Sequence, residues 1–333
     1  MKSNTKYELD HPTVSRLFKK AGIENIHRVA HLGNGEFNSV YSAEADGKSY
    51  ALKVAPLKND TILTYEQDMM AQEVFYYSVI KENTDIRIPE VYYSDFSCTD
   101  VPTPWFIMER LKGTQLDETD FTREQTIERD RKLAAMAASL HSVKGEGFGY
   151  RQNGLRDSWY AALGSMVENL IHDGERLGKK SRNGRKLLRY IRLNKDLLEQ
   201  VESRLINFDI WPANIICSKK DEDLQLAWID PERCLWGDRI ADFVCLDFNR
   251  MSLLDKKKIR EFYNAVSDQE IGSGRDEEIR YALMLAYLGL IMEIEKYARY
   301  TVFHFGWWRN VFVCHHIFKN AFRQLKLLSL REA

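Results

Sequence analysis

Short alternating runs of apolar and polar residues dominate the first third of the chain and predict strands joined by tight turns. Residues 26–56 show the pattern strand, turn, strand, turn and strand, with Asp46-Gly47 as a typical hairpin turn. Similar patterns add two strands and two helices: strands over 86–96 and 104–111, and helices over 13–22 and 64–81. The N-terminal part is therefore expected to hold a small antiparallel sheet with helices beside it.

Helical spacing replaces this alternation after residue 122. Segment 122–143 repeats apolar side chains at helical spacing with charges opposite, and residues 255–330 are helical in pattern and rich in aromatic residues. A polar connection with Gly113 follows the last strand of the predicted sheet, as in a hinge. We therefore predict an α+β, two-lobed fold, with an antiparallel-sheet lobe over residues 1–110 and a larger, mainly helical lobe over residues 111–333.

Composition places the chain among ordinary globular proteins and narrows its partners. The 333 residues are 44% hydrophobic and 29% charged, with a formal net charge of −1, which argues against nucleic acid and membranes as partners. Five cysteines without a C-x-x-C pair predict neither disulfides nor a structural zinc site. The N-terminus lacks the apolar core of a signal peptide. We expect a cytoplasmic protein, and the sequence leaves its oligomeric state open.

One segment departs strongly from this balanced charge. Residues 176–195 contain nine lysines and arginines and no acidic residue. A solvated, partly flexible helical hairpin that turns around Asn183-Gly184 explains the segment without a function. A docking face for an anionic partner is the alternative, and binding that weakens steeply with salt would favour it.

Candidate chemistry gathers in residues 205–230, where polar groups lie between two apolar runs. Asp209 and Asn214 stand five positions apart on a predicted loop, a hairpin follows, and Asp230 ends its second strand. Carboxylate and amide oxygens at fixed separation suit a divalent cation such as Mg²⁺. Kinases use the pattern Asp-x-x-x-x-Asn, followed by a strand that ends in Asp, for phosphoryl transfer.

The first turn of the predicted sheet is a candidate phosphate-binding loop. Gly33 and Gly35 would let the backbone approach a ligand closely, and free N–H groups there can hold phosphate oxygens. Asn38 stands where protein kinases have a third glycine, and Ser39 offers a hydroxyl. Gly-x-Gly is also common in ordinary hairpins, so the motif alone leaves both interpretations open.

Lys53 lies among apolar residues in the third predicted strand, where a buried ammonium group needs an acidic partner. The helix predicted over 64–81 offers Glu66 and Glu73 on one face, and we prefer Glu73, which lies in its middle. Lys53 could then hold the α- and β-phosphates of a nucleotide. If the strand lies at the sheet edge, Lys53 could instead face solvent.

The predicted hinge offers a place for the adenine ring. Met108, Glu109 and Leu111 end an apolar strand and enter the polar connection before Gly113. Adenine would bond there to backbone groups, mainly of residues 109–111, so side-chain identity tests this prediction only weakly.

Together these features resemble the aminoglycoside phosphotransferase and choline kinase-like family, whose members are small-molecule kinases with the protein kinase fold. The resemblance runs from about residue 29 to residue 250 and is strongest over 205–243. It rests on the glycine loop, the strand lysine, the helix glutamate, the Met-Glu hinge and the Asp-x-x-x-x-Asn loop, together with three further motifs: Leu140-His141, Gly237-Asp238 and Asp242.

The resemblance implies an enzyme that uses ATP or GTP as co-substrate and Mg²⁺ as cofactor. It would move the γ-phosphate to a hydroxyl of a small molecule, for example an aminoglycoside antibiotic. Asp209 would be the catalytic base, and Asn214 and Asp230 would hold Mg²⁺. Lys53, positioned by Glu73, would bind the α- and β-phosphates.

Other positions in this segment bear on the resemblance. Asp242 is expected to support the catalytic loop by accepting backbone N–H bonds, and His141 is expected to be structural. Asn207 replaces the usual histidine two positions before the base, and its amide could orient the loop instead. Pro231-Glu232 follows the metal-site aspartate where protein kinases have Phe-Gly, which suggests a loop without a switch.

The acceptor is less defined than the chemistry. Asp247, Glu293 and Tyr297 are candidate substrate contacts, and aminoglycosides, choline-like amino alcohols and sugars all remain open. A different class of function is a kinase-like binding or scaffold protein with weak or absent activity. The presence of Lys53 and Asp209 favours an enzyme, because degenerate members of such families usually lose such residues.

Overall fold

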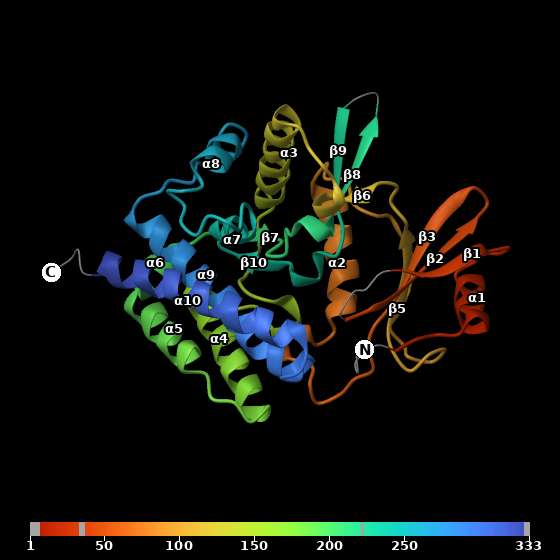
Figure 1. Cartoon of the computed structure of the whole chain (residues 1–333), viewed down its shortest axis with the longest axis horizontal. Helices are drawn as coiled ribbons and strands as arrows, with labels where there is room; N and C mark the ends of the chain where they lie inside the picture. The colour runs from red at the N-terminus through yellow and green to blue at the C-terminus, as the bar shows by residue number, and fades with distance from the viewer. Residues whose placement is uncertain (1–6, 33–36, 221–222, 330–333) are drawn as a thin grey trace.

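The N-terminal lobe is built on one antiparallel sheet (Figure 1). The computed structural model describes residues 7–32, 37–220 and 223–329. The five strands lie in the order β1-β2-β3-β5-β4. Their bounds are β1 His27–Leu32, β2 Ser39–Ala45, β3 Lys48–Val54, β4 Val91–Asp95 and β5 Trp105–Glu109.

Both faces of this sheet are covered, which explains why most residues of its central strands are buried. Helix α1, His11–Lys20, packs with the odd-numbered residues of β5 and the even-numbered residues of β3 in one apolar cluster. Helix α2, Met69–Asn83, shares a second cluster with Ala51, Phe106 and Met108, which point the other way. Side chains that face α2 therefore also face the second lobe.

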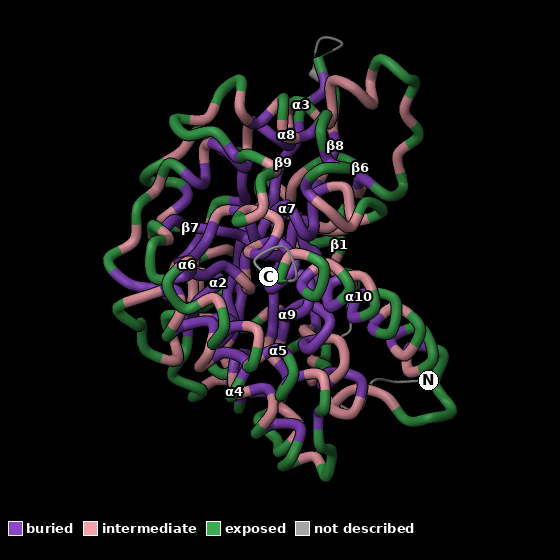
Figure 2. The backbone as a smooth tube through the Cα atoms, turned by 90° about the vertical axis from the view of Figure 1, so that its left-hand side faces the viewer, coloured by how far each residue is buried: buried purple, intermediate pink, exposed green. Residues whose placement is uncertain are grey.

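The C-terminal lobe is mainly helical and surrounds α9. Helix α9, Arg275–Arg299, is almost wholly buried along its middle, and Figure 2 shows buried backbone gathered around it. The other helices are α3 Arg123–His141, α4 Trp159–Arg176, α5 Arg182–Leu193, α6 Lys195–Glu199, α7 Asp242–Cys245, α8 Lys257–Asn264 and α10 Phe305–Ser329.

Two small antiparallel ribbons complete this lobe and carry its loops toward the sheet of the first lobe. One pairs β7, Arg204–Ile206, with β10, Leu235–Gly237. The other orders β6 Thr114–Gln115, β8 Ile215–Lys220 and β9 Asp223–Trp228 as β6-β8-β9. The predicted hairpin after residue 214 is therefore present, and the α+β, two-lobed fold is confirmed.

Two predicted boundaries were wrong, each for a local reason. The helix expected over 64–81 begins as a separate 3₁₀ turn, Thr64–Glu66, because Asp68 adopts a left-handed φ of 53° before α2 starts. The basic hairpin turns over residues 177–181, whereas Gly184 lies in α5. A Cβ atom on Gly184 would lie 2.7 Å from Ile171 Cγ1, so this glycine permits close helix packing.

The lobe boundary remains a prediction, although β5 ends at Glu109, next to the expected division between residues 110 and 111. None of the helices described over 7–32, 37–220 and 223–329 has the length and apolar character needed to cross a membrane.

Candidate active site

A carboxylate from a later segment holds the loop that follows β7. Asp242, at the start of α7, accepts hydrogen bonds from the N–H groups of Asn207 at 3.0 Å and Phe208 at 2.6 Å. Phe208 has a left-handed φ of 53°, which a bulky residue adopts only when its surroundings impose it. His141 Nε2 lies 3.0 Å from the same carboxylate. Asp242 thus fixes the backbone just before Asp209, the structural task expected of it.

The Asn207 side chain makes no hydrogen bond through Oδ1, which is buried and has no partner among the described residues. Its backbone N–H donates to Asp242. Asp242 therefore holds this part of the loop, and a loop-orienting role for the Asn207 amide stays a prediction.

Asp209 lies in this loop with its carboxylate largely buried. The Asn214 side-chain amide donates to Asp209 Oδ2 at 2.8 Å and to the Asp209 carbonyl at 3.0 Å. Burial raises the pKa of Asp209 to about 6, although the guanidinium of Arg233, 3.7 Å from Oδ1, acts to lower it. The carboxylate is oriented and titrates near neutral pH, as a general base should.

Lys53 of β3 meets three carboxylates beside this loop. Its Nζ lies 2.7 Å from Glu73 of α2, 3.0 Å from Asp230 and 3.4 Å from Glu232. Burial alone would lower the pKa of Lys53, but these carboxylates raise it well above its ordinary value, so the ammonium stays charged. The side chain is only 2% exposed and does not face solvent, the alternative that the sequence left open.

Asn214 and Asp230 have oxygen atoms to spare for Mg²⁺. Asn214 uses Nδ2 on Asp209, which leaves its Oδ1 free of that bond, and Lys53 contacts only Oδ1 of Asp230. Among the residues that the structure describes, no group of three or more His, Cys, Asp and Glu side chains could hold a metal. Mg²⁺ at this pair would need phosphate and water ligands as well, as it usually does beside nucleotides.

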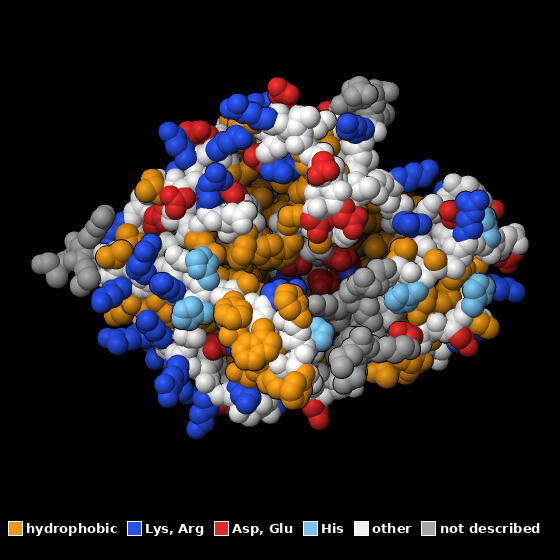
Figure 3. Space-filling view, viewed as in Figure 1, with side chains coloured by type: hydrophobic (Ala, Val, Ile, Leu, Met, Phe, Trp, Pro, Cys, Tyr) orange, Lys and Arg blue, Asp and Glu red, His pale blue; other side chains and the backbone are white. Residues whose placement is uncertain are grey.

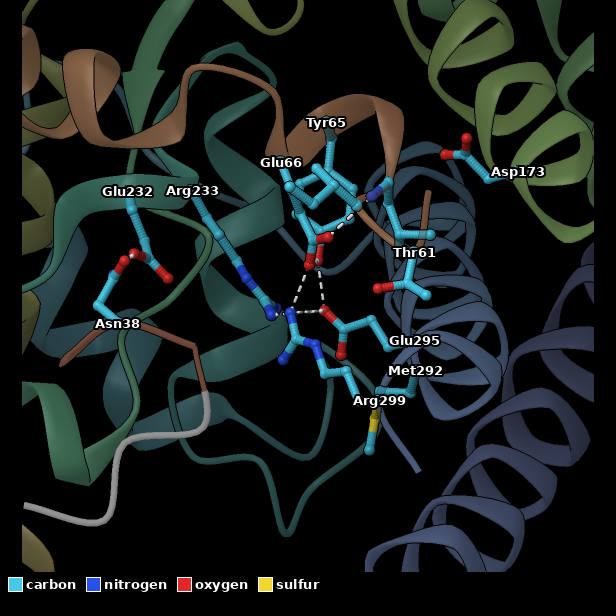
Figure 4. Close-up of polar contacts among 12 residues, drawn as sticks. Asn38, Thr61, Tyr65, Glu66, Asp173, Glu232, Arg233, Met292, Glu295 and Arg299 are labelled. Atoms are coloured by element: carbon cyan, nitrogen blue, oxygen red, sulfur yellow. Dashed lines mark hydrogen bonds and ion pairs between the residues drawn. The ribbon is translucent and has the colours of Figure 1, made fainter. Parts of the chain in front are cut away.

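Arg233, which contacts Asp209, belongs to a buried ionic cluster. Figure 4 shows this cluster, in which Arg233 and Arg299 meet Glu66 and Glu295. Glu295 of α9 accepts from Arg233 at 2.8 Å, and the Tyr65 hydroxyl also donates to it. Arg299 lies 3.2 Å from Glu295 and 2.5 Å from Glu66. Burial would raise the pKa of Glu295, but the two arginines outweigh it and lower that pKa. Two arginines therefore match the two glutamates, and Arg233 places a fixed cation beside Asp209.

Comparison with known proteins identifies the family. The model of the phosphotransferase enzyme family matches residues 28–266, more than half of the chain. The chain belongs to this family. No curated protein matches the sequence of the phosphotransferase at a significant level.

Solved structures share the fold of this phosphotransferase at low sequence identity. Aminoglycoside phosphotransferase APH(4)-Ia, in a ternary complex with AMP-PNP and hygromycin B, is 14% identical, with a TM-score of 0.61 over 94% of this chain and 98% of that one. A candidate fructosamine-3-kinase from Haemophilus somnus is 16% identical, with a TM-score of 0.63 over 94% and 96%. A streptomycin-ATP complex of APH(2″)-IIa is 18% identical, with a TM-score of 0.57 over 86% and 91%.

The residues predicted to hold phosphate lie near Lys53 where they are described. Gly33 and Gly35 lie outside the described residues. Asn38 donates to Glu232 Oε2 at 3.3 Å. Ser39 is fully buried, and its hydroxyl has no hydrogen-bond partner in the described part of the chain. A buried polar atom without a partner suits a site completed by a ligand.

The predicted hinge residues end β5 next to a cavity. Met108 is buried in the sheet, whereas Glu109 directs its carboxylate to Arg87, with Oε1 2.5 Å from Nη2. Glu109 and Leu111 line a cavity of about 510 Å³ between the lobes. Adenine binding to their backbone groups remains a prediction.

The three candidate substrate contacts lie in different surroundings. Asp247 lines a cavity of about 650 Å³ together with Trp211 of the catalytic loop. Tyr297 packs edge-on against Trp307, with the two ring centroids 4.9 Å apart. Glu293 accepts from Ser181 at 2.7 Å at the start of α5, on the side of α9 opposite Glu295. The structure thus brings Asp247 to the catalytic loop and directs Glu293 to α5.

Sequence reasoning missed the ionic cluster. Glu232 and Arg233 lie two and three positions after Asp230, and Glu295 and Arg299 stand four positions apart on a long apolar helix. Charged pairs inside an otherwise buried helix are uncommon and could have drawn attention to α9. Their link to Asp209 depends on how α9 packs, which no local pattern contains.

Proposed function

We propose that this chain moves the γ-phosphate of ATP to a hydroxyl group of a small molecule, with Asp209 as the general base. The observation that supports this proposal is the convergence of Lys53, Asp209, Asn214 and Asp230 from three separate segments: β3, the loop after β7, and the segment that follows β9. Lys53 reaches Asp230, and the N–H of the adjacent Ile229 donates to the Asn214 carbonyl at 3.0 Å. Membership of the phosphotransferase family and the nucleotide complexes of the structural neighbours support it further.

Each residue would have one task. Asp209 would accept the hydroxyl proton as the oxygen attacks phosphorus, and the hydrogen bond from Asn214 would hold the carboxylate in position. Lys53 would hold the nucleotide phosphates, with Glu73 fixing its ammonium group. Asn214 Oδ1 and the Asp230 carboxylate would hold Mg²⁺, which offsets negative charge on the phosphates when bound.

The ionic cluster bears on the choice of acceptor. A polycationic acceptor such as an aminoglycoside needs free carboxylates near the base. Glu66 and Glu295 are already paired with Arg299 and Arg233, and the Arg233 guanidinium lies 3.7 Å from Asp209. These pairs favour a neutral hydroxyl compound such as a sugar over a polycation.

Phosphorus NMR with Mg²⁺ and ATP tests the proposal on three acceptor classes: sugars and their amine adducts, choline-like amino alcohols and aminoglycosides. We expect a new phosphomonoester signal with a sugar-type acceptor, together with ADP formed in equal amount. Substituting GTP for ATP in the same assay tests the alternative donor.

Two other results would change the conclusion. A product with aminoglycosides alone would contradict the acceptor preference and leave the phosphotransferase proposal intact. If no acceptor gave product and calorimetry detected no Mg²⁺-dependent nucleotide binding, the binding or scaffold function would replace the enzyme.

A further inference from the structure

A ridge of aromatic side chains projects into solvent where α9 turns into α10. Phe303 is 94% exposed, Phe305 80%, Phe312 70% and Trp308 52%. We call these four residues the aromatic ridge. Positions 305, 308 and 312 follow the helical repeat on the outer face of α10, whereas Asn310 and Cys314 on its inner face are buried. Clustered exposed aromatics of this size are unusual on a soluble surface and mark interaction sites.

Two rows of basic side chains lie beyond this ridge, one on α5 and one on the C-terminal half of α10. Helix α5 exposes five of them and α10 exposes three; together we call them the basic rows: Arg182, Arg185, Lys186, Arg189 and Arg192 on α5, and Lys319, Arg323 and Lys326 on α10. The rows border a groove of about 600 Å³ between α5, α9 and α10. The acidic residue in that groove, Glu293, already accepts hydrogen bonds from Ser181 and Asn183.

The charge on α5 is not neutralised by the protein itself. Among the described residues, no acidic side chain forms an ion pair with Arg182, Arg185, Arg189 or Arg192. The formal net charge of −1 therefore hides an uneven distribution of charge over the molecule. Figure 3 shows a patch of exposed hydrophobic side chains on one face of the molecule, with Lys and Arg side chains to its left on the same face.

We propose that this face binds the surface of a membrane that contains anionic lipids. The aromatic ridge would enter the interfacial region, where aromatic rings are favoured, and the basic rows would lie against lipid headgroups. The contact is peripheral, because none of the described helices is long and apolar enough to span a membrane. The basic rows complement the charge of anionic lipid headgroups, and the aromatic ridge lies beside them. This combination fits an anionic membrane better than a neutral one.

Vesicle co-sedimentation tests the proposal with the full chain. We expect binding to vesicles of mixed phosphatidylglycerol and phosphatidylcholine, little binding to phosphatidylcholine alone, and a loss of binding as salt is raised. The double variants Phe305→Ser/Phe312→Ser and Arg185→Glu/Arg189→Glu should each weaken binding on the order of tenfold. These side chains are exposed, so the melting temperature should stay near that of the parent protein.

A matched control changes one apolar and one basic residue outside the face. Leu254→Ser/Lys257→Glu removes side chains that are 66% and 77% exposed, and it should bind vesicles like the parent protein. Equal binding to neutral and anionic vesicles, or no binding to either, would overturn the proposal. A dimer that dissociates in the variant Phe305→Ser/Phe312→Ser would also overturn the proposal. Binding to a single-stranded oligonucleotide in place of vesicles would do the same.

Discussion

Asp209 is held in surroundings that favour its neutral form, although its proposed role requires the charged one. Burial raises its pKa from 3.8 to about 6, and the nearby carboxylates Asp230 and Glu232 act in the same direction. Arg233 and the amide of Asn214 support the negative charge. A carboxylate in this state is a stronger base than one in water, and it destabilises the fold when it ionises.

The pH dependence of activity should report this pKa. Below about pH 6 a growing fraction of Asp209 in the free protein is protonated and cannot accept the hydroxyl proton, so kcat/KM for ATP should fall about tenfold per pH unit. A pH profile at subsaturating ATP with Mg²⁺ measures it. A kcat/KM that stayed constant down to pH 4.5 would contradict the assignment of Asp209 as the base.

The stability of the folded protein should change with pH in the direction opposite to that of its activity. Because the folded pKa is raised, the free energy of unfolding decreases as pH rises through about 4 to 6. Asp209→Asn should remove this penalty and stabilise the nucleotide-free protein by up to about 3 kcal/mol at pH 8, with little effect at pH 4. Urea unfolding at both pH values measures the difference, and an unstable variant at pH 8 would refute the account.

Most residues of the candidate site could be singled out from the sequence, and some could not. Lys53, Asp209, Asn214 and Asp230 stand at fixed spacing in short motifs, so the sequence alone singled them out. The backbone N–H of Asn207 bonds to Asp242 as expected, whereas the role of its side-chain amide stays a prediction. Arg233 and Glu295 escaped notice because their contact joins segments 62 positions apart.

At the scale of elements, the pair Lys53–Glu73 joins the sheet to α2. Glu73 is fully buried, so loss of Lys53 leaves its carboxylate without a cation, at a cost of about 3–5 kcal/mol. Lys53→Met should therefore weaken nucleotide binding and lower the melting temperature. Lys53→Met/Glu73→Gln should recover much of the stability without recovering nucleotide binding. If the double variant bound nucleotide like the parent protein, Lys53 would have no phosphate role.

Element types were largely predictable from periodicity, while their ends were not. The strands and helices of the first lobe follow from alternation and helical spacing, because one or both of their faces pack against apolar layers. The break before α2 and the turn before α5 depend on Asp68 and on contacts of Gly184 with α4 and α9. Those contacts are tertiary and leave no local signature.

At the scale of the whole molecule, the two lobes meet where β3, α2 and the catalytic loop come together. The sequence predicted this division because the pattern changes from alternation to helical spacing near residue 110. It could not predict which helix of the second lobe would face Asp209. The packing of α9 decides which helix faces Asp209. It therefore also decides which charged side chains lie near that carboxylate.

The central claim is that Asp209 accepts the hydroxyl proton during phosphoryl transfer. The most direct test compares the parent protein with Asp209→Asn in single-turnover transfer from γ-labelled ATP, using the acceptor that phosphorus NMR identifies. We predict that the variant loses transfer by about 10²–10⁴-fold while calorimetry finds Mg²⁺-dependent ATP binding unchanged. Transfer at the parent rate, with ATP bound equally well, would contradict the account.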